Sequence, residues 1–195
     1  MISFIGDVHG KVDSYAKIVR KAEYSVQVGD FGFHKQWRWL ASSGLNPSNH
    51  KVLRGNHDVP PSVFPSAYCL GDYGSFTLGG ISFFAVRGAH SIDQQYRTEG
   101  LDWWREEQLN YIGQASAFAA YEKARPSIVV THECPAYLKM MLCGQAYDAT
   151  SQLLDQMWEL HRPSVWIHGH HHKSQRLTLL DTTFVSLAEL EVFQL

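Results

Sequence analysis

Short apolar runs that end in acidic, amide or imidazole side chains recur along this chain, and they constrain its fold most strongly. Residues 2–5, 25–28, 51–53, 127–130 and 164–167 each read as a short buried strand. Helical periodicity appears between some of them, at residues 12–22 and 35–41, and again at residues 148–160, where Asp148 or Thr150 can cap the helix. This alternation predicts a layered α/β domain that binds its ligands at the carboxyl ends of the strands.

The middle of the chain has a different character. Residues 59–80 are rich in Pro, Gly, Ser and Tyr, which favours loops. The runs 75–78 and 81–86 flank Gly79-Gly80 and predict a hairpin, residues 106–122 predict a helix, and the runs 175–180 and 184–187 predict a terminal pair of strands. Because no repeat or linker is evident, we expect one domain over residues 1–195 with a loop-rich insertion around residues 58–115.

Composition excludes several classes of protein. The formal net charge of -2 gives no electrostatic footprint for nonspecific binding to DNA or membranes. Cys69, Cys134 and Cys143 have no CxxC spacing, and their odd number favours free thiols in a reducing compartment. Residues 1–7 lack the features of a signal peptide, and no apolar run reaches membrane-spanning length. The expected location is therefore the cytoplasm.

Histidine is unusually abundant, and its placement indicates a metal site. The chain contains 11 histidines, and several follow predicted strands. The side chains at these strand ends are Asp7 and His9, Asp30, Asn56, His132 and the region around His170. Carboxylate, amide and imidazole ligands together suit divalent iron, manganese or zinc. The set is too large for one tetrahedral zinc, so we expect two ions, with Asp30 as the bridging carboxylate and a shared hydroxide that attacks phosphorus.

The loop at residues 54–58 carries groups suited to phosphate chemistry. His57 is the side chain best able to move a proton near neutral pH, and Arg54 can grip a phosphate with its planar guanidinium. Asp58 is the nearest carboxylate that could orient the site, so we include it with His57 as a candidate catalytic residue. A polar loop without chemistry is the alternative for this short motif taken alone.

Five short blocks in order resemble the calcineurin-like metallophosphoesterases. They are Gly6-Asp7-Val8-His9-Gly10, Gly29-Asp30, Gly55-Asn56-His57-Asp58, Thr131-His132 and Gly169-His170-His171-His172. The resemblance implies a four-layer αββα sandwich with a dinuclear metal centre at one edge, and manganese is the expected metal, with iron, zinc or nickel as alternatives. It also implies that one ion is held by Asp7, His9, Asp30 and His172, and the other by Asp30, Asn56, His132 and His170. His57 would lie outside the ligand set and protonate the leaving oxygen.

Two features bear on which branch of the family the chain resembles. The protein phosphatase branch has a second Asp after its Gly-Asp block, whereas Gly29-Asp30 continues into Phe31-Gly32, so the partner that orients His57 stays open. Leu53-Arg54 is similar to that same branch, in which the arginine contacts phosphate. The segment at residues 87–93 resembles small phage and bacterial members, and we expect Arg87 and His90 to contact substrate; a structural Arg–Asp pair beneath the loop is the alternative.

Several assignments have competing interpretations. The histidine run allows His168/His170 or His170/His172 as the ligand pair, and the family pattern selects the second. Cys134 is expected to be a buried thiol rather than a ligand. The expected activity is that of a phosphomonoesterase on a phosphate-ester substrate. The alternatives are a phosphodiesterase or nuclease acting on nucleotides, and an interaction scaffold without catalysis. The sequence leaves the oligomeric state open.

Overall fold

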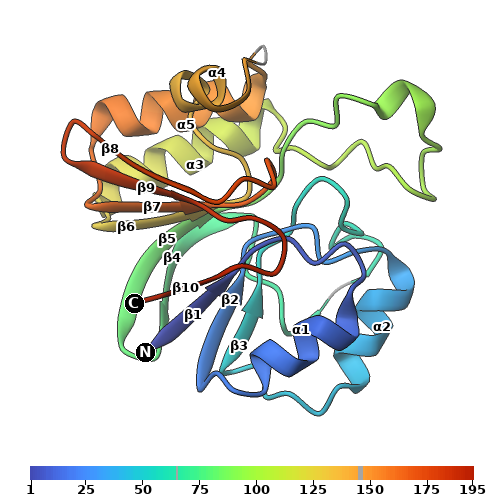
Figure 1. Cartoon of the computed structure of the whole chain (residues 1–195). Helices are drawn as coiled ribbons and strands as arrows, with labels where there is room; N and C mark the ends of the chain where they lie inside the picture. The colour runs from blue at the N-terminus through green and yellow to red at the C-terminus, as the bar shows by residue number, and fades with distance from the viewer. Residues whose placement is uncertain (65, 145–146) are drawn as a thin grey trace.

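Two β-sheets form the framework of the protein. The computed structural model describes residues 1–64, 66–144 and 147–195. The smaller sheet has the strand order β10-β1-β2-β3 (Figure 1). Its strands β1 (Ile2–Ile5), β2 (Tyr24–Gln27) and β3 (His50–Val52) run parallel, and β10 (Val192–Gln194) pairs with β1 in the antiparallel direction.

The larger sheet has six strands in the order β4-β5-β6-β7-β9-β8. Its four inner strands β5 (Ile81–Val86), β6 (Ile128–Thr131), β7 (Val165–His168) and β9 (Thr182–Ser186) are parallel. The edge strands β4 (Tyr73–Leu78) and β8 (Gln175–Leu179) close antiparallel hairpins with β5 and β9. The hairpin and the terminal pair predicted from sequence are both confirmed.

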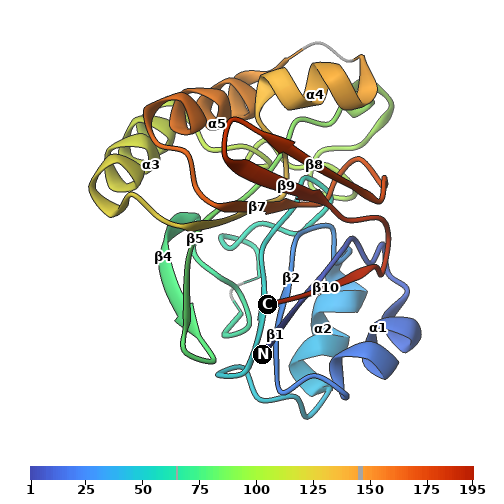
Figure 2. The same cartoon turned by 60° about the vertical axis from the view of Figure 1, so that its left-hand side comes forward.

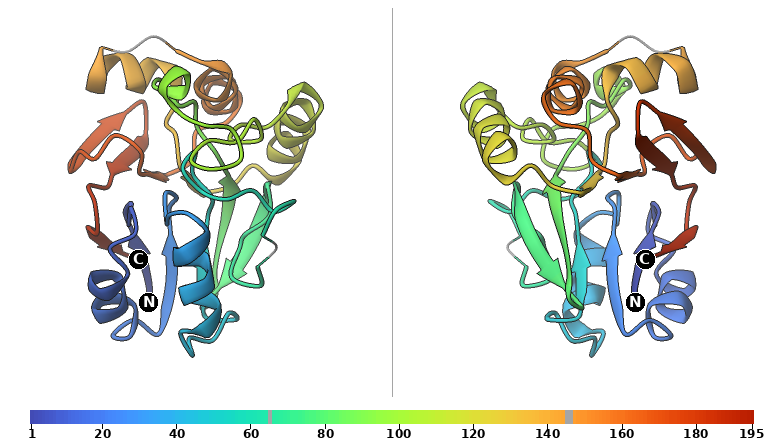
Figure 3. Two further views of the ribbon diagram at one scale, coloured as in Figure 1. Left: turned by 90° about the vertical axis from the view of Figure 1, so that its right-hand side faces the viewer. Right: turned by 90° about the vertical axis from the view of Figure 1, so that its left-hand side faces the viewer.

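Helices cover the outer faces of both sheets. The smaller sheet carries α1 (Val12–Val19) and α2 (His34–Ser42), and the larger sheet carries α3 (Tyr111–Ala124), α4 (Ala136–Cys143) and α5 (Ala149–Leu160) (Figure 2). Seen from the sides, the sheets face each other and the helices lie outside them (Figure 3). This is the four-layer αββα sandwich that the family resemblance implies.

Three apolar clusters fill the spaces between the four layers. The central cluster joins the sheets, and its members include Phe4 and Phe83, whose rings meet edge to face with centroids 6.1 Å apart. The second cluster lies between the larger sheet and its helices, around Trp166, and the third lies under α1 and α2, around Trp37. Strands such as β1 are buried along their whole length, so they appear in the sequence as short, mostly apolar runs.

Some elements differ from the sequence prediction. The helix expected at residues 106–122 begins at Tyr111, because the Asn110 side chain accepts a hydrogen bond from Gly113 N and caps it there. Asp148 caps α5 as predicted, in a capping box with Ser151. Neither α4 nor β10 was predicted; β10 is short, and only its pairing with β1 defines it as a strand.

The topology brings the carboxyl ends of both sheets to one edge of the molecule. Arg54 O, after β3, accepts a hydrogen bond from Gly88 N, after β5, and Val28 O, after β2, lies 3.0 Å from the Nδ1 atom of His132, after β6. A long connection that contains the 3₁₀ turn η1 (Gln94–Tyr96) projects from this edge at the right of Figure 1. Across the described segments, no helix is both long and apolar enough to cross a membrane.

Candidate metal centre

One half of the predicted ligand set gathers Asp7, His9 and His172. The turn after β1 supplies the first two, and the turn after β7 supplies His172. The Nε2 atoms of the two histidines lie 2.8 Å apart, and they lie 3.6 Å (His9) and 3.1 Å (His172) from Asp7 Oδ2. Asp7 is fully buried, and its carboxylate also accepts the His170 backbone N–H at 3.1 Å.

The other half gathers Asp30, Asn56, His132 and His170. His132 Nε2 lies 3.1 Å from Asn56 Oδ1 and 3.3 Å from Asp30 Oδ1, while Nδ1 of the same ring lies 3.0 Å from Val28 O. A proton on Nδ1, donated to Val28 O, leaves the Nε2 lone pair facing the two oxygens, which is the form that binds metals. Asp30, His132 and His170 each place a ligand atom within 4.8 Å of one another.

Ser91 fixes the orientation of the Asn56 amide. The Asn56 Nδ2 group donates a hydrogen bond of 2.9 Å to Ser91 Oγ, so Oδ1 turns toward His132. The backbone N–H of Ser91 donates in turn to Glu107 Oε1 at 3.0 Å. This role of Ser91 does not follow from the sequence, because its contact with Asn56 spans 35 residues and depends on the path of the loop after β5.

Asp30 lies between the two halves. Its Oδ1 faces His132, and its Oδ2 lies 3.7 Å from His9 Nε2. The backbone N–H of His57 donates to Oδ1 at 2.9 Å and holds the carboxylate in place. This placement suits a carboxylate that contributes one oxygen to each of two ions.

Several of the predicted ligands have an unusual backbone conformation. Four of the predicted ligands adopt left-handed conformations, with φ values of 44° (His9), 57° (Asp30), 65° (His170) and 52° (His172). Such conformations are unfavourable for residues with a Cβ, by about 1–3 kcal/mol each, and they concentrate at functional sites. The surrounding fold therefore stabilises four strained residues at the same edge.

Two glycines of the sequence blocks allow the close approach of these ligands. A Cβ atom at Gly55 would lie 2.6 Å from His132 Nε2 and would overlap Asp30 Oδ1, and one at Gly169 would overlap Asp7 Oδ1. Each glycine therefore makes room for ligands contributed by other blocks of the motif. This gives a physical reason why Gly precedes Asn56 and His170.

The electrostatics of the cluster favour bound cations. Burial alone would raise the pKa of Asp7, but hydrogen bonds with His172 and His9 outweigh it and lower that pKa to about 2. The pKa of Asp30 is also lowered, because His132 outweighs the effect of burial. Burial would lower the pKa of His132, but Asp30 raises it to about 10, so a bound ion would have to displace the proton that Nε2 carries near neutrality. Two buried carboxylates held as anions among imidazole nitrogens form a donor set that fits two divalent ions.

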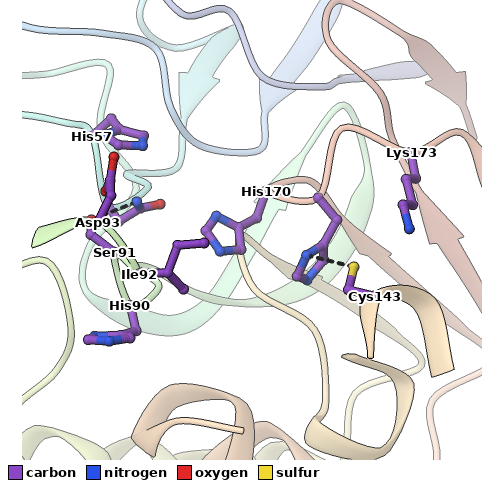
Figure 4. Close-up of a pocket in the computed structure, with 10 residues that line it drawn as sticks. His57, His90, Ser91, Ile92, Asp93, Cys143, His170 and Lys173 are labelled. Carbon is purple, nitrogen blue, oxygen red and sulfur yellow. Dashed lines mark hydrogen bonds between the residues drawn. The ribbon is translucent and has the colours of Figure 1, made fainter. Parts of the chain in front are cut away.

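His57 lies beside the cluster. Its Nε2 atom is 4.0 Å from Asp30 Oδ2, and its ring centroid is 5.6 Å from that of His9. Burial lowers the pKa of His57, with Asp30 acting in the opposite direction. In the close-up, the carboxylate of Asp93 points toward the ring of His57 (Figure 4). Asp93 belongs to the connection after β5 and was not among the predicted site residues.

The structure places Asp58 and Arg54 in different surroundings from those expected. The Asp58 carboxylate accepts the backbone N–H groups of Gly32 and Gly55, both at 2.8 Å, and burial, followed by Asp30, raises its pKa to about 6. Asp58 thus joins the loops that carry Asp30 and Asn56. Arg54 is buried; its guanidinium lies 4.9 Å from the centre of the Trp37 ring and donates to Phe64 O, on the α2 side of the loop.

Arg87 and His90 also differ from each other in placement. Arg87 pairs with Asp72 and donates to Glu106 O at 2.6 Å, so it matches the alternative of a structural Arg–Asp pair, with Asp72 as the partner. His90 lines a cavity together with Asn56 and His170 (Figure 4). Of these two residues, the structure brings His90 to the ligand cluster.

A third group of potential ligands, Glu133, Cys134 and His171, lies against the buried ammonium of Lys139. Glu133 Oε2 accepts from Lys139 Nζ at 2.7 Å, and Lys139 also donates to Asp148 at 2.6 Å. His171 Nε2 lies 2.7 Å from Glu133 Oε1, and Cys134 is buried as a free thiol. Because the buried ammonium compensates the carboxylate, we interpret this group as a structural network behind the ligand turns.

Comparison with known proteins identifies the family. A profile described as calcineurin-like phosphoesterase matches residues 1–174. The chain belongs to the calcineurin-like phosphoesterase family. Members depend on metal ions and act on phosphate esters, so this chain is a phosphoesterase, a hydrolase. The family match covers all five sequence blocks that carry the predicted ligands.

Solved structures of low sequence identity share the fold of this calcineurin-like phosphoesterase. A dimetal phosphatase from Danio rerio has a TM-score of 0.56 at 12% identity, with 97% of this chain and 88% of that chain covered. The phosphopantetheinyl hydrolase PptH from Mycobacterium tuberculosis has a TM-score of 0.55 at 14% identity, with 96% and 89% covered. No curated protein matches the chain.

Proposed function

We propose that this phosphoesterase hydrolyses its substrate at a centre of two divalent ions, with manganese as the favoured metal. Asp7, His9, Asp30 and His172 would hold one ion, and Asp30, Asn56, His132 and His170 the other. The position of Asp30 supports the proposal most directly, because its two oxygens face separate groups of imidazole nitrogens. Ions bound in this way polarise the phosphoryl oxygens and lower the pKa of an attacking water.

The side chains around the ions have distinct tasks in this mechanism. Ser91 holds the Asn56 amide so that a neutral oxygen faces the centre. His57 would deliver a proton to the departing ester oxygen, since it lies beside Asp30 without belonging to the ligand set. The contact of Arg54 with the phosphoryl oxygens stays a proposal: its guanidinium lies against Trp37, and Nε and Nη1 are buried without a hydrogen-bond partner among the described residues.

Metal reconstitution tests the proposal. Metal-stripped protein is assayed with p-nitrophenyl phosphate and bis-p-nitrophenyl phosphate, while manganese, iron, nickel, zinc and magnesium are added singly. We expect manganese to restore hydrolysis of at least one ester and to bind at two ions per chain. In Asp30→Asn, which removes the shared carboxylate, both activity and the second ion should be lost. Asp13→Asn, an exposed change in α1, is the matched control.

One result would favour the scaffold alternative. If two ions bind per chain and neither ester is hydrolysed with any metal, the proposed hydrolysis of simple phosphoric esters is refuted. If one ion binds and activity is full, the dinuclear part of the proposal is refuted while the hydrolase assignment stands.

A further inference from the structure

Two open cavities flank the metal centre. The first, the His90 cleft, has a volume of about 350 Å³, and residues that line it include Asn56, His57, His90, Ile92, His170 and Lys173 (Figure 4). The second, the Gln36 cleft, has a volume of about 420 Å³ and is lined by residues that include His9, Gly10, Phe33, Gln36, His57 and Arg97. Each has room for an organic group on one side of a phosphorus atom.

The two clefts begin at different halves of the ligand set. Asn56 and His170, from the half around His132, line the His90 cleft, whereas His9, from the half around Asp7, lines the Gln36 cleft. His57 lines both clefts. A phosphoryl group held at the metal centre therefore has an open space on each side, with His57 at the junction.

An ion pair from the connection after β5 separates the clefts. Arg97 Nε and Nη2 donate to the two carboxylate oxygens of Asp93 at 2.8 and 2.7 Å, and Arg97 Nη1 donates to Asp102 O at 3.3 Å. Asp93 faces the His90 cleft and Arg97 faces the Gln36 cleft. The ion pair therefore lies between the His90 cleft and the Gln36 cleft.

Apart from the proposed ions, the two clefts add little uncompensated positive charge around phosphorus. Among the described residues, Lys173 is the one lysine or arginine that lines the His90 cleft, and Arg97 is the one that lines the Gln36 cleft. Asp93 compensates Arg97, and Lys173 Nζ donates to Leu142 O at 2.6 Å. A phosphomonoester carries a charge of about -1.5 to -2 near neutrality, which the proposed ions would have to balance without a free guanidinium group from either cleft. A phosphodiester carries a single negative charge, and its enzyme must accommodate a second organic group.

We infer that the substrate is a phosphodiester, with one ester group in the His90 cleft and the other in the Gln36 cleft. This inference rests on the proposed hydrolysis at the metal centre and specifies its substrate class. Water adds to phosphorus, one ester oxygen departs with a proton as an alcohol, and a phosphomonoester is released. The product keeps an organic group for one cleft only, so it is a poorer substrate than the diester.

The test uses the loaded enzyme and the two p-nitrophenyl esters. We expect kcat/KM to be higher for bis-p-nitrophenyl phosphate than for p-nitrophenyl phosphate, and the diester to release one equivalent of p-nitrophenol before the second appears. Ile92 points toward His170 in Figure 4, so Ile92→Trp fills part of the His90 cleft. Gln36→Trp fills part of the Gln36 cleft. The variant in the cleft of the retained ester group should lower the diester-to-monoester ratio of kcat/KM by about tenfold, and the variant in the leaving-group cleft should slow both esters.

Matched controls place the same substitutions elsewhere. Ile112→Trp on α3 and Gln156→Trp on α5 add an exposed indole outside both clefts and should leave the ratio unchanged. Manganese binding by each variant confirms that the centre is intact. The inference is overturned if the wild-type enzyme prefers the monoester, or if the two cleft variants lower both esters equally. If the wild-type enzyme hydrolyses neither ester with any metal, the proposed function is refuted instead.

Discussion

His168 should make the stability of this protein fall steeply in mild acid. The ring belongs to the last residue of β7 and is fully buried, and burial lowers its pKa from 6.5 to about 3. The unfolded chain takes up a proton below pH 6.5, whereas the folded chain does not until about pH 3, so stability is full above pH 6.5 and is lost as the pH falls through this window. Each pH unit below 6.5 removes about 1.4 kcal/mol, which amounts to about 2 kcal/mol at pH 5.

The assay compares free energies of unfolding in urea at pH 7 and pH 5, in chelator, for wild type and His168→Leu. We expect the loss of stability from pH 7 to pH 5 to be about 2 kcal/mol smaller in the variant, because its position 168 no longer titrates. The substitution also changes packing, but this effect is the same at both pH values and cancels when the pH 7 to pH 5 losses of the two proteins are compared. The control is His34→Leu, at a partly exposed position of α2. It should change the loss of stability between pH 7 and pH 5 by less than about 0.5 kcal/mol. Equal pH dependence in wild type and His168→Leu would refute the reasoning.

Three further outcomes follow from the site and its support. His57→Gln should keep both metal ions but lower kcat by about 10²–10⁴, most for esters with poor leaving groups; full activity on an alkyl ester would contradict the proton-donor role. Ser91→Ala frees the Asn56 amide to rotate and should weaken manganese binding by about 10–100-fold in a titration of metal-stripped protein; unchanged affinity would show that Ser91 does not orient the ligand. Lys139→Met leaves Glu133 and Asp148 without their buried ammonium and should lower the free energy of unfolding by about 3–5 kcal/mol, whereas exposed Lys123→Met should change it little.

Most of the predicted ligand set could be found from sequence because its members follow a local rule, while the family pattern selected His172. Each ligand comes directly after a buried strand or in the turn beyond it, and parallel strands bring their carboxyl ends to one edge. His132 illustrates the point: an apolar run at residues 128–130 and one threonine precede it, and the structure places it within 3.3 Å of Asp30. The residues that support the ligands follow no such rule. Ser91 reaches Asn56 only through the path of a long connection.

Arg54 and Asp58 show why adjacency to a motif is a weaker guide than strand-end position. Both flank the Gly-Asn-His block, yet successive residues of a tight loop point in different directions. Arg54 turns toward Trp37 on α2, and Asp58 turns back to accept two backbone N–H groups. The left-handed conformation of Asp30 and His170 was equally out of reach, since it depends on the surrounding fold rather than on the residue type.

The hydrogen bond between Asn56 and Ser91 couples two binding events. Ser91 belongs to the connection that also supplies Ile92 and Asp93 to the His90 cleft, and Asn56 belongs to the metal centre. An ester group that ordered this connection would therefore alter the affinity for the ion proposed beside Asn56. Thermodynamic reciprocity requires the ion to alter the affinity for the ester by the same factor. Metal occupancy of this enzyme in the cell would then depend on the supply of its substrate.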